Sequence, residues 1–379
     1  MDSLLPILGT QWLNLLCLFV LLFIVFLNRR SLFNPDATSG TGFFALWLVM
    51  TLYCMFYAPP AGDNFSSIET YISYKSGVAE EYLHLEPIYF RIMDIVPSYL
   101  AWRCVIWGSG CLLLVLLLKR MKLDAHIATI VVLYFCMKLL YYQRACPAYV
   151  LLYWAMFLFV EFDKSISRIN FKKLYPLMAI GLLYLTLSFH TTMPFYVLMT
   201  VAAVLVPKSR SWAVISLLGV AVVSALLPYV ISGFLEHVSE ETVQTAELYL
   251  SIAKKGDAAN ALGLFVQIVT QSPFYIMLVY FLWNIDSAKF EYTKMEKCLL
   301  MNVLFLITAG IVMASMSVTI RAKFFVAAQL PWGLFLASLY TRKRTERPLP
   351  LFVKLLFWVW LFGLAVSVTS GSILNGNRF

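Results

Sequence analysis

The chain has 379 residues, of which 61% are hydrophobic and only 13% are charged, and its formal net charge is +9. A soluble globular domain carries about 25% charged residues, so this composition excludes an ordinary soluble protein. The positive charge is no argument for a nucleic-acid partner, because it gathers in short loops between apolar runs, as in membrane proteins.

Apolar runs of roughly membrane-spanning length recur along the whole chain. A transmembrane helix needs about 20 such residues, and only helices or closed barrels satisfy the backbone hydrogen bonds inside a bilayer. The runs lie near 11–27, 43–58, 100–118, 125–142, 147–162, 174–190, 191–207, 213–235, 261–283, 299–318, 322–340 and 351–370. They predict an all-α, polytopic helical bundle of about twelve transmembrane helices that forms one domain over residues 1–379.

The loops between these runs alternate in charge. One set holds 19 of the 29 Lys and Arg residues and eight acids, a net charge of +11, whereas the other set has a net charge of −2. Basic loops stay in the cytoplasm, so we expect both termini and the loop 59–99 on the outer face. The first run follows a stretch without basic residues and lacks a small-residue cleavage pattern. It therefore predicts a retained helix and not a signal peptide.

The loop 59–99 is the largest on the predicted outer face. Pro59-Pro60-Ala61-Gly62 ends a helix, and Asp63 or Asn64 can cap the next one. That next helix is amphipathic, and we expect it to lie in the membrane interface. Its apolar side is formed by Phe65, Ile68 and Ile72.

A second short helix is predicted from Glu86-Pro87 onward. Pro87 falls in the first helical turn, where the missing N–H costs nothing. The spacing predicts an apolar side formed by Ile88, Ile92 and Ile95.

Three further outer turns carry distinctive polar residues: Arg144, His190 and Arg321. Both arginines depart from the positive-inside bias, and a charge at bilayer depth costs about 2.5–3.5 kcal/mol on insertion scales. An ordinary explanation exists for each, since an arginine at a span end can extend its charge to the interface. His190 can equally be a neutral cap or core residue.

The two carboxylates also have ordinary explanations. Asp63 as an N-cap would contribute about 1 kcal/mol, and Glu86 at a helix start would complement the helix dipole. Taken together, however, two carboxylates, one imidazole and two arginines on one membrane face suit one chemistry. Two arginines can bind a diphosphate in a bidentate manner, while a carboxylate or histidine can take the proton from an attacking sugar hydroxyl.

These residues, in their order and spacing, resemble the EpsG family of Wzy-type exopolysaccharide polymerases. The likeness covers residues from about 45 to 340: Asp63 before a Tyr-containing helix, Glu86-Pro87, Arg144 after a tyrosine pair, His190, and Arg321 before Phe324-Phe325. The Glu-Pro element and the two arginines are its most specific parts.

The resemblance implies a metal-independent glycosyltransferase without a cofactor. It would join oligosaccharide repeat units carried on undecaprenyl diphosphate, on the outer face of the bacterial inner membrane, into an exopolysaccharide, capsule or O-antigen. Arg144 and Arg321 would bind the diphosphate, and Glu86, His190 or Asp63 would activate the acceptor. The implied partners are the lipid-linked donor and acceptor, membrane lipids, and chain-length regulator and flippase proteins.

Two alternatives remain open. A transporter, such as a flippase for lipid-linked sugars, would place ionisable residues near mid-span, whereas Arg103 and Lys138 are the only deep candidates and lie near the outer ends. A membrane O-acyltransferase would need a histidine deep in the membrane, but His126 beside Asp124 is better explained as the start of a span. The seven cysteines and four histidines show no metal-ligand spacing.

Overall fold

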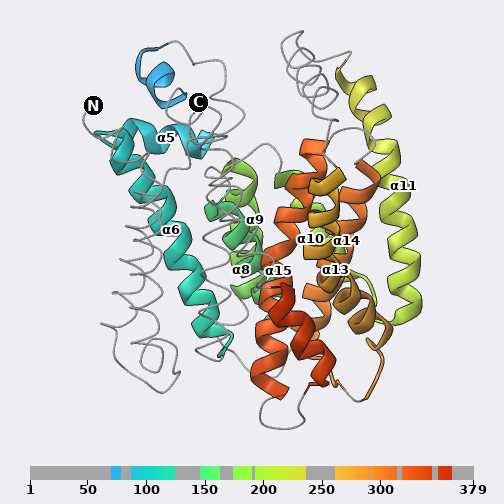
Figure 1. Ribbon diagram of the computed structural model, residues 1–379. Coiled ribbons are helices and arrows are strands. Elements are labelled where there is room, and N and C mark those ends of the chain that lie inside the picture. The colour runs from blue at the N-terminus through green and yellow to red at the C-terminus, as the bar shows by residue number, and fades with distance from the viewer. Residues whose placement is uncertain are drawn as a thin grey trace. The chain divides into compact units, whose positions relative to one another are not determined.

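The computed structural model consists of helices and the turns that join them (Figure 1). It describes residues 70–77, 87–123, 146–162, 174–189, 193–235, 261–288, 290–313, 318–343 and 349–360. Within these ranges no residue belongs to a strand, so the all-α prediction is confirmed there.

The principal helices follow the predicted runs closely. They are α5 (Pro87–Ile95), α6 (Tyr99–Arg120), α8 (Cys146–Phe162), α9 (Tyr175–Phe189), α10 (Met193–Leu205), α11 (Arg210–Leu235), α13 (Ala261–Trp283), α14 (Lys294–Met313) and α15 (Val318–Lys343). Residues 70–75 and 351–360 are also helical. The runs predicted near 11–27, 43–58 and 125–142 lie outside the described residues.

Within the part of the chain that the structure describes, three helices are long and apolar enough to cross a membrane, which is consistent with a helical membrane protein. They are Tyr99–Arg120, Lys294–Val312 and Lys323–Arg342. Shorter apolar helical stretches of 10–17 residues are Cys146–Phe162, Tyr175–Phe189, Met193–Leu205, Arg210–Leu226, Ser272–Trp283 and Leu351–Trp360. The count of about twelve spans stays a prediction.

The chain divides into two compact units, each of which has its own packing. Unit 1 comprises Met1–Leu198, Leu336–Pro348 and Val366–Phe379, and unit 2 comprises Met199–Phe335 and Leu349–Ala365. Helices α10 and α15 contribute residues to both units. The prediction of one domain over residues 1–379 stays a prediction.

Helix α8 forms the core of unit 1. It packs against both α6 and α9, and nearly all of its side chains are buried. The indole Nε1–H of Trp154 donates a hydrogen bond of 2.8 Å to the carbonyl oxygen of Leu113, which ties α8 to α6. Such a bond inside a bilayer stabilises helix association because water offers no competing partner.

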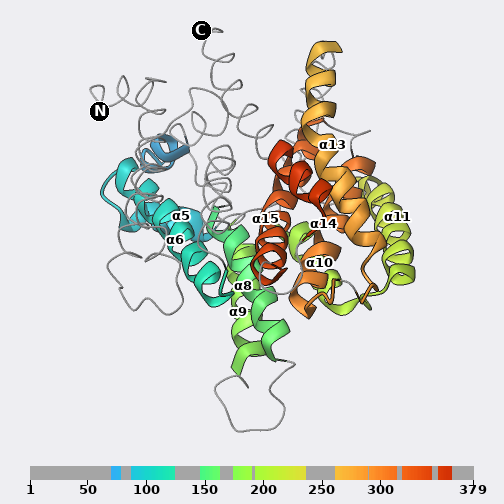
Figure 2. The ribbon, with the colours of Figure 1, turned by 60° about the horizontal axis from the view of Figure 1, so that its bottom comes forward.

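Helix α14 has the same central place in unit 2, where it packs against α11 and α13 (Figure 2). It begins with a capping box: the backbone N–H of Thr293 donates to Glu296 Oε2, and the N–H of Glu296 donates to Thr293 Oγ1, at 2.9 and 3.2 Å. All residues from 298 to 310 are buried. An aromatic group around Trp332 and Phe281 fills the space between α13 and α15.

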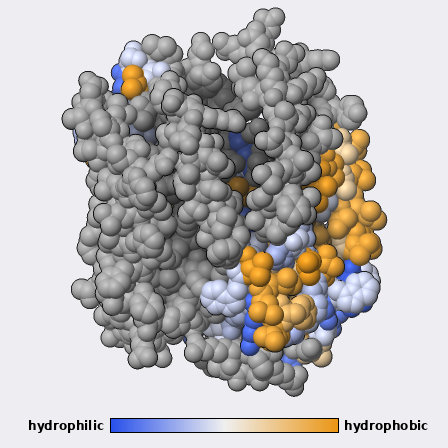
Figure 3. All heavy atoms as spheres, in the orientation of Figure 1, coloured by the Kyte–Doolittle hydropathy of each residue, from blue (hydrophilic) through white to orange (hydrophobic). Residues whose placement is uncertain are grey.

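The apolar side chains that protein does not cover are concentrated on a few helices. On α11 they are Trp212, Val214, Ile215, Leu218, Val222, Val223 and Leu226. Figure 3 shows part of this apolar surface on the described side chains of unit 2. A large exposed apolar surface marks a contact with a membrane or with another protein.

Candidate functional site

One of the five predicted site residues lies within a described helix, and three others lie within two residues of one in the sequence. Asp63, Glu86, Arg144 and His190 lie outside the described residues. Glu86 directly precedes α5, Arg144 lies two residues before α8, and His190 directly follows α9. Arg321 lies in the first turn of α15, where only the backbone is described.

Helices α6 and α8 run parallel in unit 1. A Cβ atom added to Gly110 of α6 would lie 2.5 Å from Cys146 Sγ, at the first residue of α8. Further along both helices, Trp154 of α8 bonds to Leu113 of α6. The start of α8 therefore lies beside the middle of α6 and points the same way.

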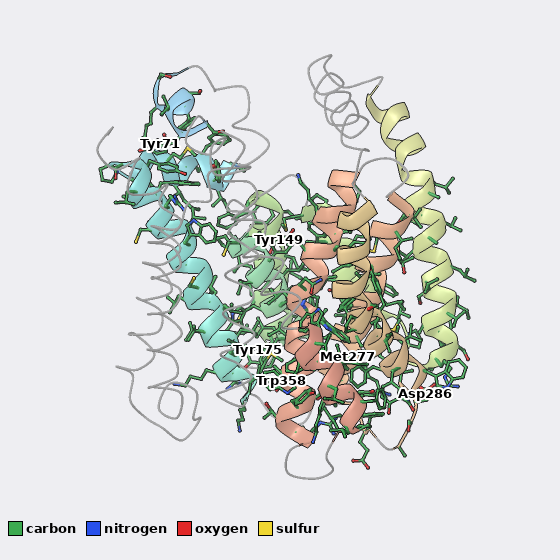
Figure 4. The ribbon with its side chains drawn as sticks, in the orientation of Figure 1. Tyr71, Tyr149, Tyr175, Met277, Asp286 and Trp358 are labelled. Atoms are coloured by element: carbon green, nitrogen blue, oxygen red, sulfur yellow. The ribbon has the colours of Figure 1, made fainter. Side chains whose placement is uncertain are left out.

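Helix α9 runs in the opposite direction. The guanidinium Nη2 of Arg120, at the end of α6, donates a hydrogen bond of 3.4 Å to the hydroxyl of Tyr175, at the start of α9. Helix α5, which leads into the start of α6, also packs against α9. Figure 4 shows Tyr71 and Tyr175 toward opposite ends of unit 1, with Tyr149 of α8 between them.

These directions turn three helix ends toward one end of unit 1, which we call the α5 end: the start of α6, the end of α9 and the start of α8, which lies beside the middle of α6. In the sequence Glu86 adjoins the start of α5, Arg144 lies two residues before the start of α8, and His190 adjoins the end of α9. The opposite end of α6 carries Lys119 and Arg120.

The α5 end is built from aromatic side chains. Tyr89 packs edge-on against Trp102 with ring centroids 4.8 Å apart, and Tyr99 stacks on Trp102 at 5.7 Å. Tyr71 contacts Tyr99 at 5.6 Å, and Tyr74 contacts Phe90 at 5.0 Å. Burial raises the pKa of the Tyr71 phenol above its ordinary value. Residues 70–77, α5 and the start of α6 thus form one packed element.

Polar contacts complete this element. The hydroxyl of Tyr74 donates a hydrogen bond of 2.8 Å to Asp94 Oδ1, which joins residues 70–77 to α5. Ser98 caps α6, since its Oγ accepts the backbone N–H of Ala101 at 3.2 Å. The segment that directly follows Glu86 is therefore held firmly in place.

The buried sides of the two short helices differ from the sequence prediction. Helix α5 buries Tyr89, Phe90 and Met93, whereas Ile95 is 83% exposed. In the preceding helical segment Tyr71 is buried and Ile72 is 51% exposed. The sequence predicted which apolar residues share a side but not which side protein covers, because hydropathy does not distinguish an apolar side chain that faces lipid from one that faces protein. Phe65 and Ile68 lie outside the described residues.

Arg103 is a buried charged residue of the α5 end. It is only 1% exposed, and its guanidinium carbon lies 5.8 Å from the ring centroid of Tyr99. A cation over an aromatic face is stabilised by the ring quadrupole, more strongly when water is excluded. The sequence showed Arg103 as a deep ionisable residue but did not assign it to the site.

In unit 2, the start of α15 is fixed by the two phenylalanines that follow Arg321. A Cβ atom added to Gly310 of α14 would lie 3.0 Å from Phe324 Cβ and 3.2 Å from ring atoms of Phe325. Phe325 also contacts Tyr275 of α13, with ring centroids 6.1 Å apart. The glycine thus permits the first turns of α15 to approach α14 closely. Because Arg144 belongs to unit 1 and Arg321 to unit 2, their convergence stays a prediction.

Among the described residues, no group of three His, Cys, Asp or Glu side chains could hold a metal ion. Comparisons of the chain with protein-family models, curated proteins and solved structures give no match.

Proposed function

We propose that the protein is a polytopic membrane glycosyltransferase of about twelve transmembrane helices, of the EpsG type. In this proposal it joins oligosaccharide repeat units carried on undecaprenyl diphosphate on the outer face of the bacterial inner membrane. The observation that carries the proposal is the direction of α6, α8 and α9. The helix ends that Glu86, Arg144 and His190 adjoin in the sequence are directed toward the same end of unit 1, with the start of α8 beside the middle of α6.

The proposed reaction is a displacement at a sugar carbon. Glu86 takes the proton of an acceptor hydroxyl, and the hydroxyl oxygen then forms a bond to the anomeric carbon of the donor. The bond from that carbon to the diphosphate oxygen breaks, and undecaprenyl diphosphate leaves. Arg144 and Arg321 neutralise the charge that develops on the diphosphate. His190 and Asp63 are the alternative bases.

The distribution of charge supports the proposed orientation. Lys119, Arg120 and Lys122 lie at the end of α6 away from the α5 end. Basic residues of this kind favour the cytoplasmic side. The α5 end would then face outward, where lipid-linked repeat units are joined.

The position of the buried charges favours an enzyme over a flippase. Among the described residues, the ionisable side chains Arg103 and Glu296 are buried. Arg103 is the fifth residue of α6, and Glu296 is the third residue of α14 and belongs to its capping box. Neither lies at mid-helix, where a transporter needs its coupling groups.

Assay of the purified protein in detergent micelles with lipid-linked repeat units tests the proposal. An enzyme forms polymer there, because the reaction needs no compartments, whereas a flippase does nothing measurable without two membrane faces. Formation of polymer by the wild type and its loss in Glu86→Gln are expected. A protein that is inactive in micelles but moves labelled lipid-linked sugar across proteoliposomes would contradict the proposal and support the flippase.

A further inference from the structure

Two exposed apolar stripes of unit 2 have a tryptophan at one end. On α11 the stripe runs from Trp212 to Leu226, and on α13 it runs from Ile276 to Trp283. Successive members are three or four residues apart, so they lie on one side of each helix. These exposed residues are Trp212, Ile215, Leu218, Val222 and Leu226 on α11, and Ile276, Val279 and Trp283 on α13. Tryptophan at the end of such a stripe is typical of the boundary between bilayer and water.

Arg210 brings the two tryptophan ends together. Its guanidinium Nη2 donates a hydrogen bond to the carbonyl oxygen of Trp283, and its Cζ lies 4.6 Å from the centroid of the Trp283 ring. Arg210 is the first residue of α11, and Trp283 is the last residue of α13. The start of α11 therefore lies beside the end of α13, and Trp212 and Trp283 mark the same boundary.

Asp286 adds a negative charge at this boundary. Its Oδ2 accepts a hydrogen bond of 2.8 Å from the backbone N–H of Arg210, so the carboxylate is held beside the arginine. Both side chains are exposed, and Figure 4 shows Asp286 at the lower end of α11, below Met277 of α13. The bond to Trp283 uses only one of the several N–H groups of the guanidinium. A positive and a negative group thus lie together directly beyond two interfacial tryptophans.

This pair of charges is complementary to the headgroup of one class of lipid. Phosphatidylethanolamine carries a phosphate and a primary ammonium that are joined by a short link. A guanidinium binds phosphate through its N–H groups, and a carboxylate accepts charge-assisted hydrogen bonds from an ammonium. Phosphatidylcholine has a quaternary ammonium without N–H groups, and phosphatidylglycerol has no cation. Neither of these lipids brings a charged donor to a carboxylate.

We propose that Arg210, Asp286, Trp212 and Trp283 form a site for one molecule of phosphatidylethanolamine. The phosphate binds to Arg210, the ammonium binds to the carboxylate of Asp286, and the acyl chains lie along the apolar stripes of α11 and α13. Charge complementarity favours this lipid over a protein partner, because the two charges lie where a headgroup lies, directly beyond the interfacial tryptophans. The site is separate from the proposed reaction and requires only that unit 2 lies in a bilayer.

Lipid binding is measured by native mass spectrometry of the full chain in detergent, with dioleoyl lipids that differ only in the headgroup. The wild type should bind phosphatidylethanolamine about 2- to 5-fold more tightly than phosphatidylcholine, the range for an exposed ion pair. Phosphatidylglycerol should also bind more weakly than phosphatidylethanolamine. Equal Kd values for phosphatidylethanolamine and phosphatidylcholine, or tightest binding of phosphatidylglycerol, would overturn the site.

Asp286→Asn tests the pairing of the carboxylate with the ammonium. Asparagine keeps an oxygen that can accept the N–H of Arg210 but lacks the charge, so the preference for phosphatidylethanolamine over phosphatidylcholine should disappear. Glu291→Gln is the matched control, because it removes the same charge from an exposed residue between α13 and α14. This variant should keep the preference. A preference that survives in Asp286→Asn, or that is lost in Glu291→Gln, would overturn the pairing.

Two further measurements test the phosphate contact and the occupant of the stripes. Arg210→Gln should weaken the binding of all three phospholipids, because each carries the phosphate. If Arg210→Gln does not fold, the Asp286 and Glu291 variants still decide. Dioleoylglycerol, which has the acyl chains but no phosphate, should bind more weakly than any of them. Equal binding of dioleoylglycerol and phosphatidylethanolamine, or a dimer of the chain that excludes lipid, would overturn the site.

Discussion

Cys146 occupies the space that a side chain at Gly110 would need. A Cβ atom at Gly110 would lie 2.5 Å from Cys146 Sγ and 3.5 Å from the backbone nitrogen of Pro147. A separation of 2.5 Å is far below van der Waals contact, so α6 and α8 meet here through a glycine. This contact sets the height of the start of α8 along α6.

Gly110→Ala should therefore destabilise the protein although alanine favours helices. Overpacking typically costs about 1–3 kcal/mol, which exceeds the gain of about 0.5–1 kcal/mol from replacing a helical glycine. Thermal unfolding in detergent measures the difference. Gly181→Ala in α9 is the control, because its added Cβ meets nothing within 4 Å. The double variant Gly110→Ala/Cys146→Ala should recover stability, and a failure to recover it would contradict this account of the contact.

Replacement of Glu86, the proposed base, by glutamine should remove the basic carboxylate while preserving the size of the side chain. Glu86→Gln should lower the rate of polymer formation about 10²–10⁴-fold, the usual contribution of general base catalysis. Donor binding should survive, because the diphosphate is bound elsewhere. Assays of Glu86→Gln, His190→Gln and Asp63→Asn with the same lipid-linked substrate rank the three. Near-normal chain extension by the Glu86 variant beside an inactive His190 variant would transfer the role to the histidine.

The two arginines should not tolerate lysine. Lysine keeps the charge of arginine but loses the planar group that binds phosphate in a bidentate manner. Arg144→Lys and Arg321→Lys should each impair polymer production while membrane levels of the protein stay unchanged. Full polymer production by both variants would eliminate the diphosphate role and leave extension to the interface as the explanation of both residues.

The predicted topology is accessible to labelling in intact cells. Single cysteines at Ser66 and Ser167, in a chain without native cysteines, should respond differently to a membrane-impermeant thiol reagent. Ser66 lies in the predicted outer loop 59–99 and Ser167 in a basic loop, so only the cysteine at 66 should react. The reverse result would invert the orientation and remove the argument for an outward-facing site.

A buried polar pair within unit 2 should couple α14 to the end of α10. Asn302 Nδ2 donates a hydrogen bond of 3.0 Å to Thr200 Oγ1, and both residues are buried. A double-mutant cycle with Thr200→Val and Asn302→Leu should give a coupling energy of about 0.5–2 kcal/mol, the range for such bonds inside membranes. Unfolding measurements provide the four stabilities. Strictly additive effects would show that the pair contributes no coupling.

The positions of the described helices could be predicted from the sequence, and their buried faces could not. Charged and helix-capping residues mark the ends of apolar runs, so α6 begins and ends within two residues of its predicted run near 100–118. The prediction that a short helix starts at Pro87 is also confirmed. In contrast, hydropathy could not predict that Ile95 is exposed and that Tyr89 is buried. A bilayer and a protein core both favour apolar side chains, so hydropathy does not tell them apart.

The candidate site shows the same division. The order of Glu86, Arg144 and His190 along the chain can be read directly, and alternating loop charge predicts that they share one membrane face, which stays a prediction. The close contact at Gly110 could not be predicted. It depends on which turns of α6 and α8 face each other, and no local pattern encodes that relationship.

The burial of α14 has a consequence for how unit 2 responds to bilayer thickness. Residues 298–310 of α14 have neighbouring protein on all sides, whereas α11 presents a broad apolar surface from Trp212 to Leu226. Lipids with shorter or longer acyl chains act on the helices that they touch, at a cost of fractions of a kcal/mol per ångström of mismatch. Changes in acyl-chain length should therefore change the tilt of α11 relative to the membrane and leave the tilt of α14 unchanged.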